Sequence, residues 1–535
     1  MTIKSGNFLL PKKSKKTQTL KNSFMKNEFS RREFIRTGSV SLAGMAILPS
    51  FLSMGCNRLT EQSGLEEYLA HFNVDREILQ KVISEALSRG GDYCDLYFEH
   101  SLSNYVGLQD NEVNRAGSNI DYGVGVRVLK GDQTGYAFSE EVSLEAMLKV
   151  AKTAASIANE SKNFPAVDLS EKVHPEYYNF KTSWEDVSIK QKIPYLQKLN
   201  DKIFALDDKV DKVQVYLNDD SSYMLFANSE GVLSFDYRPM FSLYASAVMI
   251  DGDKKEDFGA SRSMRVGFEY LKEELLDEMA NEIVTGAKRQ FLAGKPKAGE
   301  MPVVLAAGSS GILLHEAIGH AFEADFNRKE TSIFADKMGK KIGEDFVTIV
   351  DDGTNPNIRG SVNIDDEGID TQKTKLVENG VLTSYIHDRI SAKHYGVNPT
   401  GNGRRESFRY APLPRMRNTY MENGPHSKED IISSVKEGIF VDSFTNGEVQ
   451  IGAGDFTFYV KAGYLIEDGK ITQPIKDINL IGNGPEALGH IEMVGNDFKM
   501  DCGTWTCGKG GQGVPVSLGL PTIKVAKLTV GGVNA

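Results

Sequence analysis

Apolar residues in the first third of the chain change from helical to alternating spacing and back again. Residues 75–87 have helical spacing and are followed by a glycine pair, a common end of a helix. A second helical stretch covers 143–159. The pattern predicts a unit made of a helix, several antiparallel strands and a helix. The expected strands cover 94–100, 106–108, 123–129 and 135–138.

A second unit repeats this plan after a proline-containing connector at 163–183. Helical spacing covers 189–206, and one long helix is expected over 268–292. The residues between them alternate and predict strands. Those strands are expected at 213–218, 223–228, 232–236 and 242–250.

The rest of the chain, from about 297 onward, is dominated by short strand patterns with one helix near residue 315. Glu378-Asn379-Gly380 and Thr445-Asn446-Gly447 each carry the Asn-Gly pair that favours tight hairpins, so both predict turns. Strands are expected at 347–351, 374–378, 381–386, 439–444, 448–451, 456–464 and 521–530.

The order of these patterns predicts an α+β fold. Two small α/β units, at 68–160 and 185–293, precede a β-rich C-terminal domain at 297–535. That domain carries the helix with the candidate metal-binding residues described below.

Composition narrows the class of protein. With 40% hydrophobic and 25% charged residues, the chain resembles an ordinary globular protein. Its net charge of −11 provides no basic field for phosphates, so we expect no nucleic-acid partner. Four cysteines are too few for a disulfide framework in a chain of 535 residues.

The N-terminal region, 1–56, predicts an export signal. Ser30-Arg31-Arg32-Glu33-Phe34-Ile35-Arg36 resembles a twin-arginine signal, and the apolar stretch after it, 37–52, is too short to span a membrane. Cys56 lies at a loose lipoprotein-type cleavage site and is a candidate for acylation. We therefore expect export to the periplasm or cell envelope, with a lipid anchor as a further option. A basic tail without a targeting role is the alternative.

The strongest chemical signal is His315-Glu316-Ala317-Ile318-Gly319-His320. Two imidazoles with a glutamate beside the first are typical of zinc peptidases, whose histidines are usually at i and i+4. Here they are at i and i+5, about 140° apart on an ideal helix. Both could bind one ion only if the helix had a wide turn, for which Gly319 is well placed. Two histidines brought near a helix by chance are the alternative.

A third ligand could come from the glycine-rich segment 500–513, which contains Cys502 and Cys507. A thiolate with two imidazoles would leave the fourth zinc position for water, as in catalytic sites. The same segment nearly matches a phosphate-binding loop, but Gly510 occupies the position that needs Ser or Thr, which argues against a nucleotide.

Three segments resemble the TldD/PmbA metallopeptidase family, and more narrowly its TldD branch. They are HEAIGHAFEADF (315–326), APLPRMRNTYMENG (411–424) and CGKGGQGVPVSLGLPTIKV (507–525). The resemblance implies zinc held by His315, His320 and Cys507, with Glu316 as the general base that takes the proton from the zinc-bound water. It leaves Cys502 without a counterpart.

The resemblance also implies a substrate and a partner. It predicts cleavage of peptides or of unfolded and flexible protein segments. It predicts a dimer, either a heterodimer with a PmbA/TldE-like subunit or a homodimer. The loop 395–424 would lie near the active cleft. By composition alone, its five arginines would instead suggest a solvated basic surface.

Two other functions remain as alternatives. One is a non-catalytic envelope scaffold, or a partner subunit that keeps the family fold. Members of the wider family have also been called modulators of DNA gyrase. The acidic charge balance and the expected export signal both argue against a role on DNA.

Overall fold

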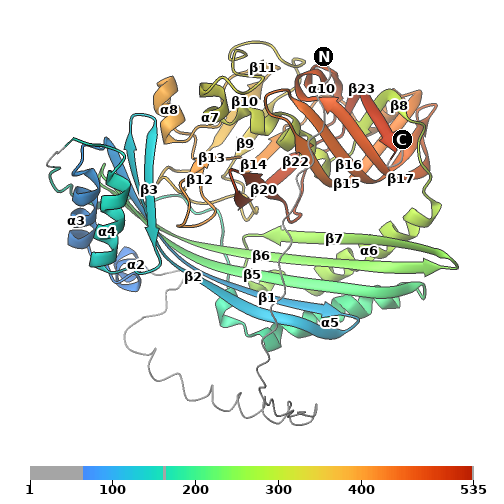
Figure 1. Cartoon of the computed structure of the whole chain (residues 1–535). Coiled ribbons are helices and arrows are strands. Elements are labelled where there is room, and N and C mark those ends of the chain that lie inside the picture. The colour runs from blue at the N-terminus through green and yellow to red at the C-terminus, as the bar shows by residue number, and fades with distance from the viewer. Residues whose placement is uncertain (1–63, 161–163, 533–535) are drawn as a thin grey trace, which may run out of the picture. The chain divides into compact units, whose positions relative to one another are not determined.

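The computed structural model describes residues 64–160 and 164–532, which belong to one compact unit. The expected signal region and Cys56 lie outside these residues, so export and acylation stay predictions. The α+β fold class is confirmed: long strands, helices and a β-rich C-terminal part follow one another along the chain (Figure 1).

The first half of the chain forms a seven-stranded sheet. Its strands β3, β2, β1, β5, β6 and β7 are antiparallel neighbours in that order, and the short β4 pairs in parallel with β6. Their bounds are β1 (Tyr93–Gln109), β2 (Glu112–Lys130), β3 (Gln133–Ser139), β4 (Ser170–Glu171), β5 (Val210–Asn228), β6 (Val232–Asp251) and β7 (Lys254–Met264).

These strands are much longer than the alternating pattern predicted. The runs 94–100 and 106–108 belong to the single strand β1, and 213–218 and 223–228 both belong to β5. Polar residues interrupt the apolar pattern midway, but the backbone pairing continues through them, for example at Ser103↔Asp220. The two expected units therefore share one continuous sheet.

Five helices cover one face of this sheet in two groups. The first helix of the apolar pattern forms as expected because Asp75 caps it, accepting a hydrogen bond from the Ile78 amide (2.7 Å). One group packs on Leu96 and Leu225, the other on Leu108 and Leu217. The helices are α2 (Leu65–His71), α3 (Arg76–Leu87), α4 (Leu144–Ala155), α5 (Ile189–Ala205) and α6 (Glu273–Leu292).

The opposite face of the sheet meets the C-terminal domain. Tyr97, Met224 and Phe226 point to this side, where they form a small buried cluster with Ile364 and Phe408. Side chains alternate between the two faces of a strand, so even-numbered β1 residues contact helices while Tyr97 contacts the C-terminal domain.

The C-terminal domain contains two six-stranded sheets around one large core. In the first, β17, β16, β15, β8 and β23 pair in sequence and β17 also pairs with β23, which closes the sheet on itself. Its strands are β8 (Gly299–Leu305), β15 (Glu437–Val449), β16 (Asp455–Glu467), β17 (Lys470–Asn483), β18 (Ile491–Val494) and β23 (Ile523–Gly532). The second contains β9 (Ile349–Asp352), β10 (Lys373–Glu378), β11 (Val381–Leu382), β14 (Asn418–Met421), β19 (Lys499–Met500) and β22 (Ser517–Leu520).

One of the two predicted hairpin turns is correct and the other is wrong. Asn379 and Gly380 have positive φ and connect β10 to β11. The expected turn at 445–447 lies inside β15, where Asn446 and Gly447 pair with Tyr459 and Phe458 of β16. Register shifts nearby show that the strand is bulged at this place, so the segment bends without reversing.

None of the helices in the described part of the chain is long and apolar enough to cross a membrane.

Candidate metal centre

The histidine pair lies on a π-helix. The segment η5 (Leu314–Gly319) has π-helical hydrogen bonding and leads directly into a 3₁₀ turn, η6 (His320–Phe322). This confirms the predicted wide turn. It brings the two imidazoles to one side of the chain, with ring centroids of His315 and His320 5.0 Å apart. Such turns are frequent at functional sites because they re-aim side chains within a helix.

Gly319 is needed for packing more than for backbone freedom. Its φ of −60° is an ordinary helical value. A Cβ built on it would lie 2.2 Å from the sulfur of Met416, which belongs to the loop 395–424, called the arginine-rich loop below. Glycine at this position therefore lets that loop approach the π-helix closely.

Cys507 reaches the histidines from a two-stranded hairpin, β20 (Thr506–Lys509) and β21 (Gln512–Pro515). Gly510 and Gly511, with φ of 60° and 76°, form its turn. The Cys507 Sγ lies 3.5 Å from the His320 Nε2. The donor atoms of His315, His320 and Cys507 all lie within 4.8 Å of one another.

The sequence left two cysteines as candidates, and the structure distinguishes them. Cys507 is 2% exposed and faces the imidazoles. Cys502 lies elsewhere in the loop, where its backbone carbonyl accepts a hydrogen bond from the Ser263 amide (2.6 Å).

The donor set has the character of a metal site. Both ring nitrogens of His315 are buried without a hydrogen-bond partner among the described residues. A buried polar atom without a partner is costly, and a bound ion would remove that cost. Burial raises the pKa of the Cys507 thiol, but the neighbouring His315 and His320 outweigh it and hold that pKa well below its usual range. Two imidazoles and a sulfur that readily loses its proton are a ligand set that suits zinc.

A carboxylate that the sequence reasoning missed orients His320. Glu323 is fully buried, and its Oε2 lies 3.0 Å from the His320 Nδ1. With Nδ1 donating to this carboxylate, Nε2 is the nitrogen that faces the Cys507 sulfur. Carboxylate–histidine pairs of this kind fix the tautomer of metal-binding imidazoles. The sequence did contain a signal for this contact: Glu323 follows His320 by three residues, a spacing that places two side chains on the same side of a helical turn.

A lysine holds Glu323 in its ionised form. The Lys509 Nζ lies 3.0 Å from the Glu323 Oε2 and 2.7 Å from the Asp325 Oδ1. Burial alone would raise the pKa of Glu323, but Lys509 and His320 lower it to about 2. Because Lys509 follows Cys507 by two residues on β20, the hairpin supplies both the sulfur and the cation that supports the second ligand.

Glu316 is partly exposed beside the bulged strand. Burial raises its pKa, which the two imidazoles oppose. A Cβ built on Gly447 would lie 3.2 Å from the Glu316 Cγ and 2.4 Å from the Phe458 ring. The glycine that suggested a hairpin turn therefore leaves room for the candidate base.

The loop 395–424 is mostly buried, not a solvated surface. Arg404, Arg405, Arg415 and Arg417 are each 5% exposed or less. The Arg415 Nη2 donates to the Cys507 carbonyl (2.6 Å). This bond connects the loop to the hairpin β20–β21, which we call the metal hairpin because it carries Cys507. The expectation drawn from the family resemblance, that the loop lies near the site, is confirmed.

Comparison with known families gives three matches in chain order. Domain 1, the central domain and the C-terminal domain of the PmbA/TldA metallopeptidases match residues 94–158, 182–291 and 298–532.

Individual relatives match over most of their length. A protein of Buchnera aphidicola named "Metalloprotease TldD homolog" is 40% identical over 84% of this chain and 95% of its own. One of Saccharolobus solfataricus named "Zinc metalloprotease TldD homolog" is 30% identical over 84% and 99%. The crystal structure of TldE from Thermococcus kodakarensis has the same fold, with a TM-score of 0.66 and 21% identity over 85% of this chain and all of that one.

Proposed function

This chain belongs to the PmbA/TldA metallopeptidase family, and on that premise we propose that it hydrolyses peptide bonds with zinc held by His315, His320 and Cys507. The observation that carries the proposal is the cluster of three buried donors whose ligand atoms lie within 4.8 Å of one another. The zinc in a relative's name supports the choice of ion.

The residues present fit a zinc ion. His315 offers ring nitrogens that have no hydrogen-bond partner in the described part of the chain, His320 is oriented by Glu323, and Cys507 contributes the sulfur. Three protein ligands leave one position open, as in catalytic zinc sites. When bound, the ion would supply Lewis-acid polarisation of water and of the scissile carbonyl.

Glu316 is the proposed general base. It lies next to the first ligand in the sequence and is partly exposed, so water can reach it. It accepts the proton from the attacking water and delivers it to the leaving amine.

We propose peptides or unfolded, flexible protein segments as substrates. Much of the surrounding domain is β-structure, which can accept an extended chain through backbone hydrogen bonds with little sequence preference. We also propose a dimer, with a TldE-like subunit as the preferred partner because TldE shares this fold. Size-exclusion chromatography with and without such a partner tests this.

The expected export signal gives the proposal a location. A chain carried by the twin-arginine route to the periplasm or cell envelope, with or without a lipid on Cys56, would act on peptides there. Fractionation of cells that express the full chain, compared with an Arg31→Lys/Arg32→Lys variant, tests export. Mass spectrometry of the mature N-terminus tests acylation.

One experiment separates this proposal from a non-catalytic scaffold. The purified protein and a Cys507→Ser variant are assayed for bound zinc and for cleavage of an unstructured peptide. We expect about one zinc per chain and cleavage only in the unsubstituted protein, with activity lost on chelation and restored by zinc. A metal-free protein that does not cleave, while keeping its fold, would favour the scaffold.

A further inference from the structure

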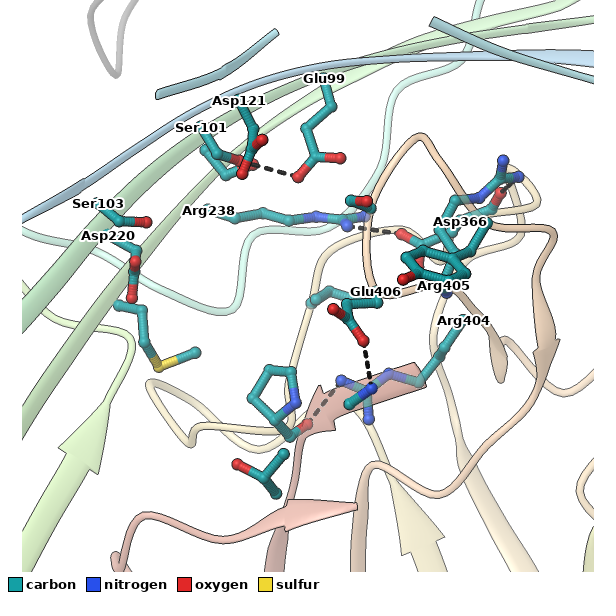
Figure 2. A pocket seen from close by; sticks show the side chains of 18 of the residues that line it. Glu99, Ser101, Ser103, Asp121, Asp220, Arg238, Asp366, Arg404, Arg405 and Glu406 are labelled. Carbon is teal, nitrogen blue, oxygen red and sulfur yellow. Dashed lines mark hydrogen bonds and ion pairs between the residues drawn. The ribbon is translucent and has the colours of Figure 1, made fainter. Parts of the chain in front are cut away.

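A cavity of about 500 Å³ lies between the long sheet and the arginine-rich loop. Figure 2 shows Glu99 and Arg238 reaching into it from the sheet, with Arg404 and Arg405 on the opposite side. The cavity borders the metal hairpin, because Thr506 also lines it. Thr506 precedes Cys507 on β20, and successive residues of a strand point to opposite faces. The hairpin therefore faces the metal cluster on the Cys507 side and this cavity on the Thr506 side.

Seven arginines line the cavity, and three of them are paired with carboxylates. Arg238 pairs with Asp366 (2.6 Å), Arg405 with Asp95 (3.5 Å) and Arg409 with Asp121 (2.8 Å). The other four have no carboxylate at ion-pair distance within the described ranges 64–160 and 164–532. These four are Arg265, Arg359, Arg404 and Arg417.

Neutral groups hold these four guanidinium groups in place. The Arg359 Nε donates to the Trp505 carbonyl (3.0 Å), and its Nη1 donates to the Ser263 hydroxyl (2.6 Å). Arg265 donates to the Pro239 carbonyl (3.2 Å). Arg404 and Arg417 likewise donate to backbone carbonyls. Each guanidinium is oriented by neutral acceptors and forms no ion pair among the described residues, although Asp220 attracts Arg359 through space.

A buried charge without an ion-pair partner is costly. Several such arginines around one cavity therefore indicate that a ligand brings the anion. Burial lowers the pKa of Arg265 and of Arg359 to about 10, which is still far above neutrality. Five carboxylates line the cavity beside the seven arginines, so the lining keeps an excess of positive charge; they are Glu99, Asp121, Asp220, Asp366 and Glu406.

Arg359 connects this cavity to a second one. The neighbouring space, of about 640 Å³, shares Arg359 and Thr506 with the first. Its floor includes Tyr216 and Tyr244, whose rings are stacked with centroids 6.2 Å apart. Together the two spaces form a trough along the sheet. One end has the two tyrosine rings, with the Arg115 guanidinium 4.5 Å from the centroid of the Tyr216 ring, and the other end has the arginines described above.

We propose that this trough binds an extended peptide and that its arginine-lined end is a subsite for a peptide carboxylate, with Arg359 and Arg265 as the recognising cations. Guanidinium groups match the planar geometry of a carboxylate and form charge-assisted hydrogen bonds with it. The carboxylate can be an acidic side chain or the C-terminus of the peptide. The inference rests on the proposed function only in taking a peptide as the ligand.

The test measures binding, not cleavage, so that it can fail independently of the peptidase proposal. The full chain carrying Glu316→Gln is titrated with four synthetic Ala-Ser peptides labelled at the N-terminus. They contain one internal Glu or Gln, and each is made with a free or an amidated C-terminus. We expect the Glu peptides, the free-acid peptides or both to bind about tenfold tighter than the doubly neutral peptide, with the advantage shrinking as salt rises.

The arginine variants assign the preference to the cavity. Arg359→Gln and Arg265→Gln, each introduced separately, should reduce it to about twofold or less. Arg262→Gln is the matched control, because Arg262 lies on β7 just before Arg265 but pairs with Glu278 and Glu282 outside the cavity. It should retain the full preference.

The comparison of charged and neutral peptides needs no arginine variant, so misfolding cannot hide the answer. A preference for only the Glu side chain or only the C-terminus identifies the source of the carboxylate. Equal binding of all four peptides at low salt would overturn the proposal, as would a preference that both Arg359→Gln and Arg265→Gln leave unchanged.

Discussion

The metal cluster and the arginine-lined cavity lie on opposite faces of the hairpin β20–β21, and both contain buried polar groups that the protein leaves incompletely satisfied. In the cluster these groups are lone-pair donors, the His315 nitrogens and the Cys507 sulfur. In the cavity they are cationic N–H donors, the Arg265 Nε and the Arg417 Nη2, which have no hydrogen-bond partner among the described residues. The first set suits a cation and the second an anion. A buried group without its natural partner thus indicates the kind of ligand as well as the place.

The two regions also differ in how they are supported. His320 is held by Glu323, which is held in turn by Lys509, so the second ligand has a complete chain of charged partners. Arg359 is held by a carbonyl and a hydroxyl, both neutral. We therefore expect the loss of a ligand in the cluster to be nearly all-or-none, and changes in its supporting residues or in the cavity to be graded.

The largest expected effect follows from removing a ligand of the cluster. His315→Ala or His320→Ala should lose stoichiometric zinc, because two remaining ligands do not make a stable site. Metal content measured by mass spectrometry on the folded protein checks this. Cys502→Ser, a cysteine in the same loop but away from the cluster, is the control and should keep its zinc. A histidine variant that still binds one zinc per chain is not missing a ligand.

Glu316→Gln should separate chemistry from metal binding. The amide cannot accept a proton as the carboxylate does, so cleavage should fall by about 100-fold or more while zinc stays bound. The rate of hydrolysis of an unstructured peptide, measured with metal content on the same sample, checks this. Full activity in the variant would remove Glu316 from the role of base.

Glu323→Gln should have an intermediate effect. The substitution keeps the size of the side chain but removes the charge that orients His320, and changes of this type weaken metal binding about 10- to 100-fold. Competition for zinc against a chelator of known affinity measures the loss. Glu344→Gln, on an exposed residue of the same domain, is the control. Unchanged affinity in Glu323→Gln would show that Lys509 and the backbone suffice to position the imidazole.

The smallest expected effect belongs to the cavity and depends on pH. Glu99 accepts hydrogen bonds from the Phe408 amide and the Ser101 hydroxyl and lies near Asp366 and Arg238. Burial raises its pKa to about 7 in the folded protein, from about 4.5 when unfolded. The folded state therefore binds this proton more tightly, and its free energy of unfolding should fall as pH rises from about 4.5 to about 7.

Glu99→Gln tests that pH dependence. The variant should lose this part of the fall in stability. Its free energy of unfolding, measured in urea titrations, should therefore rise relative to that of the unsubstituted protein between about pH 4.5 and about pH 7. Binding of the acidic peptide should also weaken several-fold over the same range only where Glu99 is present, because its ionisation adds a negative charge to the cavity. Glu112→Gln, exposed on the same sheet, is the control. Parallel stability curves for Glu99→Gln and the unsubstituted protein would contradict the assignment.

Local sequence signals predicted a feature correctly where the interactions that form it are between residues close together in the chain. Asp75 and the apolar spacing after it defined α3, and Asn379-Gly380 defined a true hairpin turn because both residues adopt positive φ. The i, i+5 spacing of His315 and His320 already required a wide turn, because an ordinary helix would point them apart. The choice of Cys507 over Cys502 came from the family resemblance, since both cysteines occupy the same glycine-rich segment.

Other features depend on contacts between residues far apart in the chain, which no local pattern contains. The middle of β1 is polar and looks like a break, yet it pairs with β5 across more than a hundred residues of sequence. Gly447 looks like a turn residue, but it is required by Phe458 and Glu316, which pack against it. The arginines of the loop 395–424 resemble a solvated surface until the sheet covers them. In each case hydrogen bonding and packing between distant segments override the local preference.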